Sequence, residues 1–187
     1  MKLTSTKLQG VVLIEPAVFG DDRGWFSESF NEACFTGALQ ALGLPAPPHF
    51  VQDNHSCSKA GVLRGLHYQL PPHAQGKLVR VVRGAAFDVA VDIRRGSPTF
   101  GKWAGVELSE ANRRQLWIPE GFAHGFIALE DDTHFLYKTT DVYAKDCERS
   151  IAWNDPAIAI EWPRLGGAPL LAPKDAAAPH LAAADLF

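Results

Sequence analysis

Short apolar segments recur along most of the chain, and within them the dominant period is two. From residue 87 to residue 94, large apolar side chains occupy every second position as far as Ile93, which is typical of a β-strand with one face on the core. This pattern places Asp88 and Asp92 on the outward face. Similar alternating or continuous apolar runs occupy residues 11–14, 25–30, 62–68, 77–82, 103–108, 115–118, 126–129 and 135–139.

Turn-forming sequences separate these runs. They lie at residues 20–24, 70–72, 83–84, 96–98 and 119–121. Many short strands at this spacing predict an all-β protein. A closed or sandwiched antiparallel barrel is favoured, because open sheet edges promote aggregation. No repeat, linker or low-complexity segment divides the chain, so we expect one domain over residues 1–187.

Only one segment shows clear helical spacing. Asn31 can cap its N-terminus, and Phe35, Leu39 and Leu42 fall on one face. Gly43 ends this helix before a proline-rich stretch. A second, shorter helix is expected near the C-terminus.

Composition and charge exclude several classes of protein. The net charge of −3 gives no electrostatic reason to expect nucleic acid or an anionic membrane as a partner. The three cysteines are an odd number without paired spacing, which predicts reduced thiols rather than disulfides or a zinc site. The first residues lack the apolar run of a signal peptide, and no stretch has the length of a membrane span. We therefore expect a soluble cytoplasmic protein.

The segment from residue 61 to residue 70 carries the most informative side chains. It sets Arg64 and His67 three positions apart in an otherwise apolar strand, where polar groups are costly unless they have partners. On a regular strand the two would face opposite sides, but Gly65 between them allows a bulge that brings both to one cavity. Lys77 and His124 also occupy strand-like positions. A site built on the sheet is therefore favoured over a solvated face.

These side chains suit the removal of a proton from carbon. A histidine is a base near neutral pH, and a lysine or a second histidine beside it can stabilise an oxyanion. Structural roles remain open for each residue. His67 can be a core histidine bonded to a backbone carbonyl, and Tyr137 can be an ordinary barrel aromatic. Arg64, Arg23 and Lys174 can each be surface charge.

Metal-dependent and hydrolytic chemistry have less support in the sequence. A metal-binding cupin needs a His-x-His pair with a nearby glutamate and a distant histidine, whereas His67 is followed by Tyr68 and Gln69. No Gly-x-Ser-x-Gly motif is present, and Cys57 and Cys147 lack an evident base partner. We therefore expect neither a metal site nor a catalytic nucleophile.

Eight sequence blocks, taken in order, carry a likeness to a known family. They lie at residues 19–26, 51–56, 62–69, 76–81, 87–94, 117–126, 137–141 and 153–156. Together they resemble the dTDP-4-dehydrorhamnose 3,5-epimerase family over nearly all of residues 10–175. The resemblance implies a cupin-type double-stranded β-helix (jelly roll) with a few short helices. It also implies a homodimer that needs no metal or other cofactor and acts on a dTDP-sugar.

Through this resemblance individual residues gain expected roles. His67 matches the general base, Asp175 the carboxylate that orients it, and Tyr137 the acid on the other face of the sugar. Lys77 and His124 resemble the residues that hold the ketone oxygen and the neighbouring hydroxyl. The family's contacts to the sugar and the diphosphate correspond to Gln52, Asp53, Asn54, Arg64, Glu148 and Lys174. Its nucleotide-site residues correspond to Arg23 and Glu28, and the family draws these partly from the partner subunit.

The implied activity is epimerisation of dTDP-4-dehydro-6-deoxy-D-glucose at carbons 3 and 5, which gives dTDP-4-dehydro-L-rhamnose. Both carbons flank the ketone at carbon 4, so loss of either hydrogen gives an enolate on the same oxygen. Inversion requires a proton to leave one face and another to arrive on the opposite face, and His67 and Tyr137 supply two groups. The alternatives are a mono-epimerase acting on a related dTDP-4-keto-6-deoxysugar, a metal-dependent cupin oxygenase or isomerase, and a non-catalytic nucleotide-sugar-binding cupin.

Overall fold

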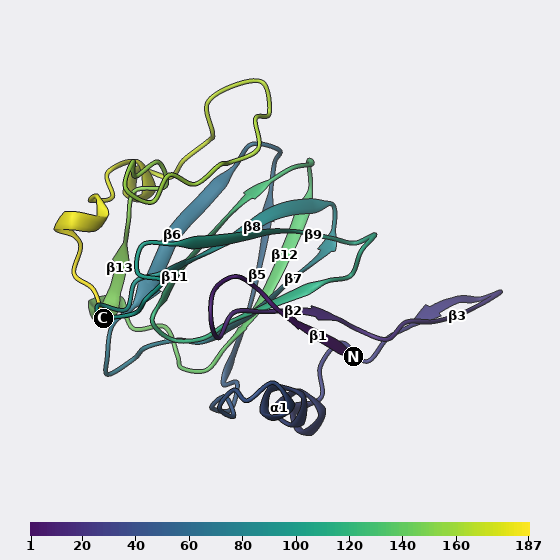
Figure 1. Cartoon of the computed structure of the whole chain (residues 1–187). Helices are drawn as coiled ribbons and strands as arrows, with labels where there is room; N and C mark the ends of the chain where they lie inside the picture. Colours follow the sequence, from purple (N-terminus) through teal and green to yellow (C-terminus); the bar gives the residue numbers. More distant parts are fainter.

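The computed structural model describes residues 1–187, and most of its regular structure is β-strand (Figure 1). The strands are β1 (Lys2–Ser5), β2 (Val12–Glu15), β3 (Phe19–Asp21), β4 (Gly24–Phe26), β5 (Gln52–Ser58), β6 (Leu63–Gln69), β7 (Lys77–Arg83), β8 (Ala85–Asp92), β9 (Trp103–Ser109), β10 (Gln115–Ile118), β11 (Phe122–Ala128), β12 (Thr133–Thr139) and β13 (Glu148–Ser150). The helices are α1 (Glu32–Ala41) and the short α2 (Pro173–Ala176), with 3₁₀ turns η1 (Lys145–Cys147) and η2 (Leu181–Ala183). None of these helices is long and apolar enough to cross a membrane.

Two antiparallel sheets pack against each other. One has the strand order β1-β2-β10-β7-β12-β5 and the other the order β13-β6-β11-β8-β9. Neighbouring strands are mostly distant in sequence, which is the connectivity of a jelly roll rather than of a meander. The expected all-β jelly roll with a few short helices is therefore confirmed.

The main core fills the space between the two sheets. Val79, Val81 and Phe135 reach it from the six-stranded sheet, and Ala90 and Phe126 reach it from the five-stranded sheet. The rings of Phe126 and Phe135 stack with their centroids 4.0 Å apart. Each large apolar side chain buried in this way contributes about 1.5–3 kcal/mol to folding. This core fixes the distance between the sheets and so the width of any cavity between them.

The C-terminal segment covers the other face of the five-stranded sheet. Val89 and Val91 of β8 pack there against Leu181, while the alternate residues Asp88 and Asp92 are 0% exposed. The prediction that these two aspartates face solvent is therefore wrong. A period of two in the sequence identifies the two faces of a strand but not what covers each face. In β8 both faces are covered, one of them by the C-terminal segment, which is distant in sequence.

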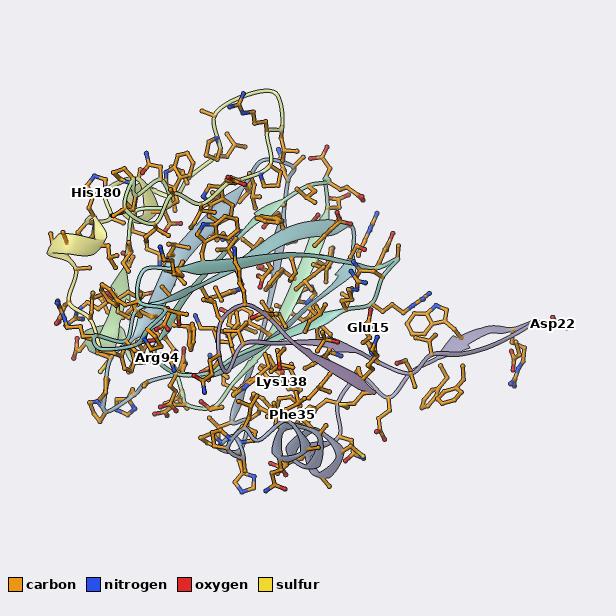
Figure 2. The ribbon with its side chains drawn as sticks, viewed as in Figure 1. Glu15, Asp22, Phe35, Arg94, Lys138 and His180 are labelled. Carbon is orange, nitrogen blue, oxygen red and sulfur yellow. The ribbon has the colours of Figure 1, made fainter.

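Helix α1 covers part of the outer face of the six-stranded sheet. Asn31 caps it, because its side chain accepts a hydrogen bond of 3.1 Å from a backbone amide of the first turn. Phe35, labelled in Figure 2, and Leu39 are buried. The ring of Phe35 meets Trp117 edge-on at 5.5 Å. The predicted helix is confirmed. Leu42, expected on the same buried face, is exposed because it is the C-cap residue that follows the last helical turn.

Most predicted strands are present, with shifted ends. The sequence pattern does not predict β5, because that strand consists almost entirely of polar residues and has no apolar face. β11 begins at Phe122, four residues before the predicted run, since its glycine and histidine interrupt the apolar pattern. The run predicted over residues 25–30 contains only the end of β4.

The hairpin of β3 and β4 projects away from both sheets, with Asp22 at its tip (Figures 1 and 2). Phe19, Trp25 and Phe26 on this hairpin are 65%, 60% and 68% exposed. Three large apolar side chains clustered on one projecting element are unusual for a surface that stays in contact with water.

Strand β6 contains a bulge at Gly65. Pairing with β11 joins Arg64 to Phe126 and His67 to His124, so three residue steps on β6 match two on β11. The bulge expected between Arg64 and His67 is thus confirmed. The two backbones approach closely at this point, which requires glycine on both strands.

Replacing Gly125 by alanine should destabilise the protein. The new Cβ would lie 2.8 Å from the backbone oxygen of Arg64 and 3.2 Å from the Cα of Gly65, so the strands must separate, at a cost of about 1–3 kcal/mol. Urea unfolding measures this cost. Gly37→Ala is the control, because a Cβ there has no neighbour within 4 Å and should stabilise helix α1 by about 0.5–1 kcal/mol. Unchanged stability of the Gly125 variant would contradict the steric account.

Candidate active site

A cavity of about 130 Å³ lies between the two sheets, at the ends of β5, β6, β7 and β12. It brings together side chains that are distant in sequence and of which most can donate or accept a hydrogen bond. The lining residues are Gln52, Asn54, His67, Tyr68, Gln69, Gln75, Lys77, Tyr137, Tyr143 and Glu148. Six of the residues expected from the sequence to form a site are therefore neighbours.

His67 forms one side of the cavity and is held by Asp175. The Nε2 atom of His67 lies 2.6 Å from Oδ1 of Asp175, which is 2% exposed at the start of the short helix α2. An ionised carboxylate can only accept, so Nε2 carries the hydrogen and Nδ1 of the neutral ring is left as the proton acceptor. A carboxylate behind a histidine in this way fixes both its tautomer and its orientation.

Lys77 crosses the space between the sheets. It begins β7 of the six-stranded sheet, and its Nζ donates to the backbone oxygen of His67 on the other sheet at 3.2 Å. Burial lowers the pKa of this ammonium to about 8, against the opposing effect of the Asp88 carboxylate. Near neutral pH, Lys77 is therefore a positively charged donor in a poorly solvated site, which is the arrangement that best stabilises a developing oxyanion.

Tyr137 faces the same cavity from β12. Burial raises the pKa of its phenol, while the positive charges of Arg64 and Lys174 act in the opposite direction. Tyr137 therefore stays protonated at neutral pH and can donate a proton. Since His67 belongs to the five-stranded sheet and Tyr137 to the six-stranded sheet, the two groups approach a bound molecule from different sides.

His124 is the cross-strand neighbour of His67 and lies deeper in the barrel. Its Nε2 atom is 2.7 Å from Oδ1 of Asp88, on β8. Burial lowers the pKa of this imidazole even though Asp88 acts to raise it, so His124 is neutral near pH 7. The protein thus contains two carboxylate–histidine pairs on adjacent strands.

Polar side chains line the mouth of the cavity. Gln52 donates to the side-chain oxygen of Asn54 at 3.0 Å and accepts from the amide of Tyr143 at 3.0 Å. Glu148 pairs with Lys174 at 2.9 Å. Burial acts to raise the pKa of Glu148, but the hydrogen bonds from Lys174 and Tyr143 and the nearby positive charges together outweigh it, so this pKa is lowered. Arg64 lies nearby on β6, where its Nε donates to Ser58 at 3.2 Å.

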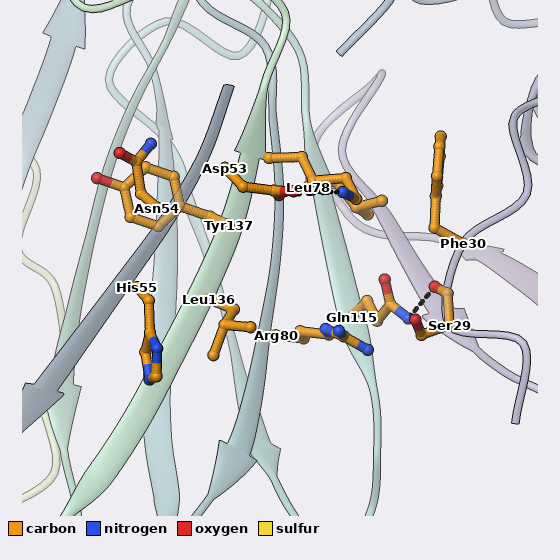
Figure 3. Close-up of a pocket in the computed structure, with 11 residues that line it drawn as sticks. Ser29, Phe30, Asp53, Asn54, His55, Leu78, Arg80, Gln115, Leu136 and Tyr137 are labelled. Carbon is orange, nitrogen blue, oxygen red and sulfur yellow. Dashed lines mark hydrogen bonds and ion pairs between the residues drawn. The ribbon is translucent and has the colours of Figure 1, made fainter. Parts of the chain in front are cut away.

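Three of the expected binding residues lie elsewhere in this chain. Asp53 is on the outer face of the six-stranded sheet, where it pairs with Lys138 at 2.9 Å and borders a second hollow of about 200 Å³ beside Leu78 (Figure 3). Strand alternation explains this, because Gln52 and Asn54 on either side of it face inward. Arg23 and Glu28 flank the projecting hairpin and line neither hollow.

Sequence reasoning missed five residues of the site and its surroundings. Tyr68, Gln69 and Gln75 line the cavity, but such residues in strands and loops carry no recognisable signal. Tyr143 lies in a loop and is placed by its hydroxyl contact with Glu148 at 3.2 Å. Asp88 was expected to face solvent and instead supports His124. No group of three or more histidine, cysteine, aspartate or glutamate side chains is arranged to hold a metal ion.

Comparison with known proteins agrees with this geometry. The family model described as dTDP-4-dehydrorhamnose 3,5-epimerase matches residues 5–183. The chain belongs to this family. The 3,5-epimerase of Shigella flexneri is 57% identical over 187 residues, which cover 100% of this chain and 99% of the relative. The resemblance inferred from the eight sequence blocks is confirmed.

Solved structures of other epimerases share the fold. The epimerase RmlC of Legionella pneumophila, in complex with dTDP-4-keto-L-rhamnose, superposes with a TM-score of 0.91 at 52% identity and covers 98% of this chain and 94% of its own. ChmJ, a 3'-monoepimerase from Streptomyces bikiniensis bound to dTDP-quinovose, is similar at 37% identity with a TM-score of 0.84, covering 95% and 86% of the two chains. The cupin-type fold and the epimerase family are therefore established for this chain, and both double and single epimerases occur among its structural relatives.

The epimerase should become more stable at neutral pH when Lys77 is replaced by methionine. The lowering of the Lys77 pKa from 10.5 to about 8 means that the folded state binds this proton less tightly than the unfolded state, at a cost of about 3 kcal/mol below pH 8. Between pH 8 and 10.5 the unfolded chain holds the proton that the folded chain has lost, so wild-type stability recovers. Urea unfolding at pH 7 and pH 10 should show the advantage of the variant shrinking at the higher pH.

The exposed Lys59 provides the control for this experiment. Lys59→Met should change stability little and equally at both pH values, because an exposed ammonium has no burial penalty to lose. An advantage of Lys77→Met that is the same at pH 7 and pH 10 would contradict the assignment of the cost to the buried charge.

Proposed function

We propose that this protein epimerises dTDP-4-dehydro-6-deoxy-D-glucose at carbons 3 and 5 to give dTDP-4-dehydro-L-rhamnose. The observation that carries the proposal is a buried ammonium, Lys77, flanked by two proton-transfer groups on opposite sheets, His67 and Tyr137. The family match over residues 5–183 supports it. We propose further that residues 1–187 act as one domain, since the C-terminal segment provides Asp175 to the site.

The reaction begins with loss of a proton from a carbon next to the ketone. Nδ1 of His67 takes this proton, and Asp175 stabilises the imidazolium that forms. The electron pair of the broken C–H bond becomes the enolate, whose negative charge develops on the ketone oxygen. Lys77 donates to that oxygen, and a fixed donor in a poorly solvated site stabilises the transition state more than the neutral ketone.

Inversion requires the new proton to arrive from the opposite face. Tyr137 is a protonated phenol on the other sheet, and delivery of its proton to the carbon restores the ketone with inverted configuration. The same oxygen carries the enolate for carbon 3 and for carbon 5, so one oxyanion site serves both steps. Before the second step, water takes the proton from the His67 imidazolium and returns one to the Tyr137 phenolate, and the sugar then presents the other carbon to the same pair of groups.

The nucleotide part is bound at the mouth of the cavity. Arg64 and Lys174 are the cations placed to meet the diphosphate, and Gln52 and Asn54 offer amides to sugar hydroxyls. The complex of the Legionella pneumophila relative with dTDP-4-keto-L-rhamnose supports a dTDP-sugar as the ligand. The three free cysteines fit the expectation that the protein works in the cytoplasm.

The functional unit in this proposal is a homodimer. The projecting hairpin exposes Phe19, Trp25 and Phe26, which need a second surface to cover them. Arg23 and Glu28 lie at this hairpin, away from the cavity of their own chain, so they can reach a nucleotide only in a partner subunit. The hairpin thus accounts for both the exposed apolar surface and the two displaced binding residues.

Incubation with the substrate in heavy water tests the function directly. Abstraction and reprotonation at both carbons should place deuterium at carbon 3 and at carbon 5, as located by NMR. Label at one carbon only would identify a mono-epimerase, such as the structural relative ChmJ. Binding of the dTDP-sugar without any label would mean a non-catalytic binding protein.

Two variants assign the proton-transfer steps in the same assay. His67→Asn should lower deuterium entry at both carbons by about 10²–10⁴-fold while the nucleotide-sugar still binds, because only the base is removed. Tyr137→Phe should keep deuterium entry but retain configuration, since the enolate recovers a proton on the face of His67. Inverted product at the wild-type rate from Tyr137→Phe would exclude the phenol as the acid.

Subunit mixing tests the shared site. Arg23→Ala and His67→Asn homodimers should each have low activity, whereas a 1:1 mixture after subunit exchange should recover about a quarter of the wild-type sites, as expected for random pairing in a two-fold dimer. Asp22→Ala, at the tip of the same hairpin, is the control. Homodimers of this variant should keep wild-type activity, so subunit exchange has no lost activity to restore. No recovery despite verified exchange would count against sites completed by the partner.

A further inference from the structure

Asp88 is a buried carboxylate that the mechanism above does not use. It lies in the middle of β8, opposite Phe126 of β11, and is 0% exposed. Its Oδ1 is 2.7 Å from Nε2 of His124, whereas its Oδ2 accepts no hydrogen bond from any protein group. An ionised carboxylate with an unpaired oxygen is costly in a protein interior, so its position in the core requires a compensating role.

The charges around Asp88 identify that role. Lys77 is the other buried charge in this part of the barrel, and Asp88 is the carboxylate that most strongly favours its protonated form. Glu148 acts in the same direction and Lys174 in the opposite one. Lys77 and His67 in turn disfavour a positive charge on His124. Lys77 and Asp88 are thus opposite charges in this part of the barrel, and the neutral imidazole of His124 meets the Asp88 carboxylate.

We propose that Asp88 is a positioning residue of the epimerase site, which fixes the tautomer of His124 and provides the buried counter-charge for the Lys77 ammonium. The proposal rests on the epimerase function proposed above. Because Nε2–H of His124 donates to Asp88, Nδ1 is left as an acceptor for a hydroxyl of the sugar. Because the carboxylate is ionised, Lys77 stays protonated in a site whose burial favours the neutral amine. Asp88 touches neither the substrate nor the reacting carbon.

Asp88→Asn keeps the shape of the side chain and removes its charge. We expect kcat to fall about 10–100-fold, the usual effect of removing a supporting carboxylate, while the affinity for dTDP changes little. The alkaline limb of the kcat profile should move to lower pH by about one unit, because Lys77 loses a favourable charge. Lys77→Arg, whose guanidinium does not titrate in this range, should lose that limb and thereby assign it.

Asp92→Asn is the matched control on the same strand. Asp92 is also 0% exposed, but its carboxylate is fully occupied by Arg94, Ser97 and Thr99. This variant should lower Tm without moving the alkaline limb or kcat. The positioning role is wrong if Asp92→Asn changes kcat and the alkaline limb as much as Asp88→Asn does. It is also wrong if Asp88→Asn changes neither kcat nor the alkaline limb.

Two measurements on the ligand-free protein separate this inference from the proposed function. In wild-type protein with ¹⁵N-labelled histidine, NMR should show His124 protonated at Nε2 and not at Nδ1, and the opposite tautomer would overturn the proposal even if Asp88→Asn does not fold. NMR titration of labelled lysine should show a lower Lys77 pKa in Asp88→Asn than in wild type. A wild-type protein that exchanges no deuterium into the dTDP-sugar would refute the epimerase function while leaving these two results to decide the role of Asp88.

Discussion

Enclosure of the Lys77 ammonium between two sheets is the constraint on which the rest of the site depends. An ammonium in such a place loses most of its hydration, and its pKa falls to about 8. Burial favours the neutral amine, whereas the carboxylates of Asp88 and Glu148 favour the charged form, and the ammonium donates to a backbone oxygen of the opposite sheet. The core that sets the spacing of the sheets therefore also sets how strongly this donor can stabilise an oxyanion.

The segments near the two ends of the chain have different relations to the cavity between the sheets. Asp175 orients His67 across 108 residues of sequence, and it does so because the C-terminal segment returns along the covered face of the five-stranded sheet. The N-terminal hairpin extends in the other direction and leaves its aromatic residues exposed (Figure 1). One terminus thus closes the site within the chain, while the hairpin near the other leaves Phe19, Trp25 and Phe26 on the surface.

The sequence predicts the strands well where they are rich in apolar residues, as at Gln115–Ile118, and the helix well where Asn31 provides a cap. The sequence predicts the burial of a residue poorly where contacts with residues distant in sequence determine it. Asp88 has the same alternating neighbours as a solvated residue, but it shares the face of β8 that directs Ala86 and Ala90 into the core between the two sheets, where the opposite sheet buries it. The side chains of the site were assigned by family resemblance, since spacing alone brings Arg64 and His67 together at the bulge but leaves their chemistry undecided.

The fold by itself does not decide how many carbons are inverted. The 3'-monoepimerase ChmJ shares it with a TM-score of 0.84. In the mechanism proposed above, the number of inverted centres depends on how the sugar is held between His67 and Tyr137. Tyr137 lies on β12 with Phe135, and His67 lies on β6, which pairs with the β11 strand of Phe126, so the stacked rings of Phe126 and Phe135 help to fix the separation of the two sheets. In that proposal the sugar moves relative to the protein between the two steps, and the polar side chains at the cavity mouth, where Glu148 pairs with Lys174, are the groups that can limit its rotation. The proposal thus assigns specificity for one or two centres to this polar rim rather than to the proton-transfer residues.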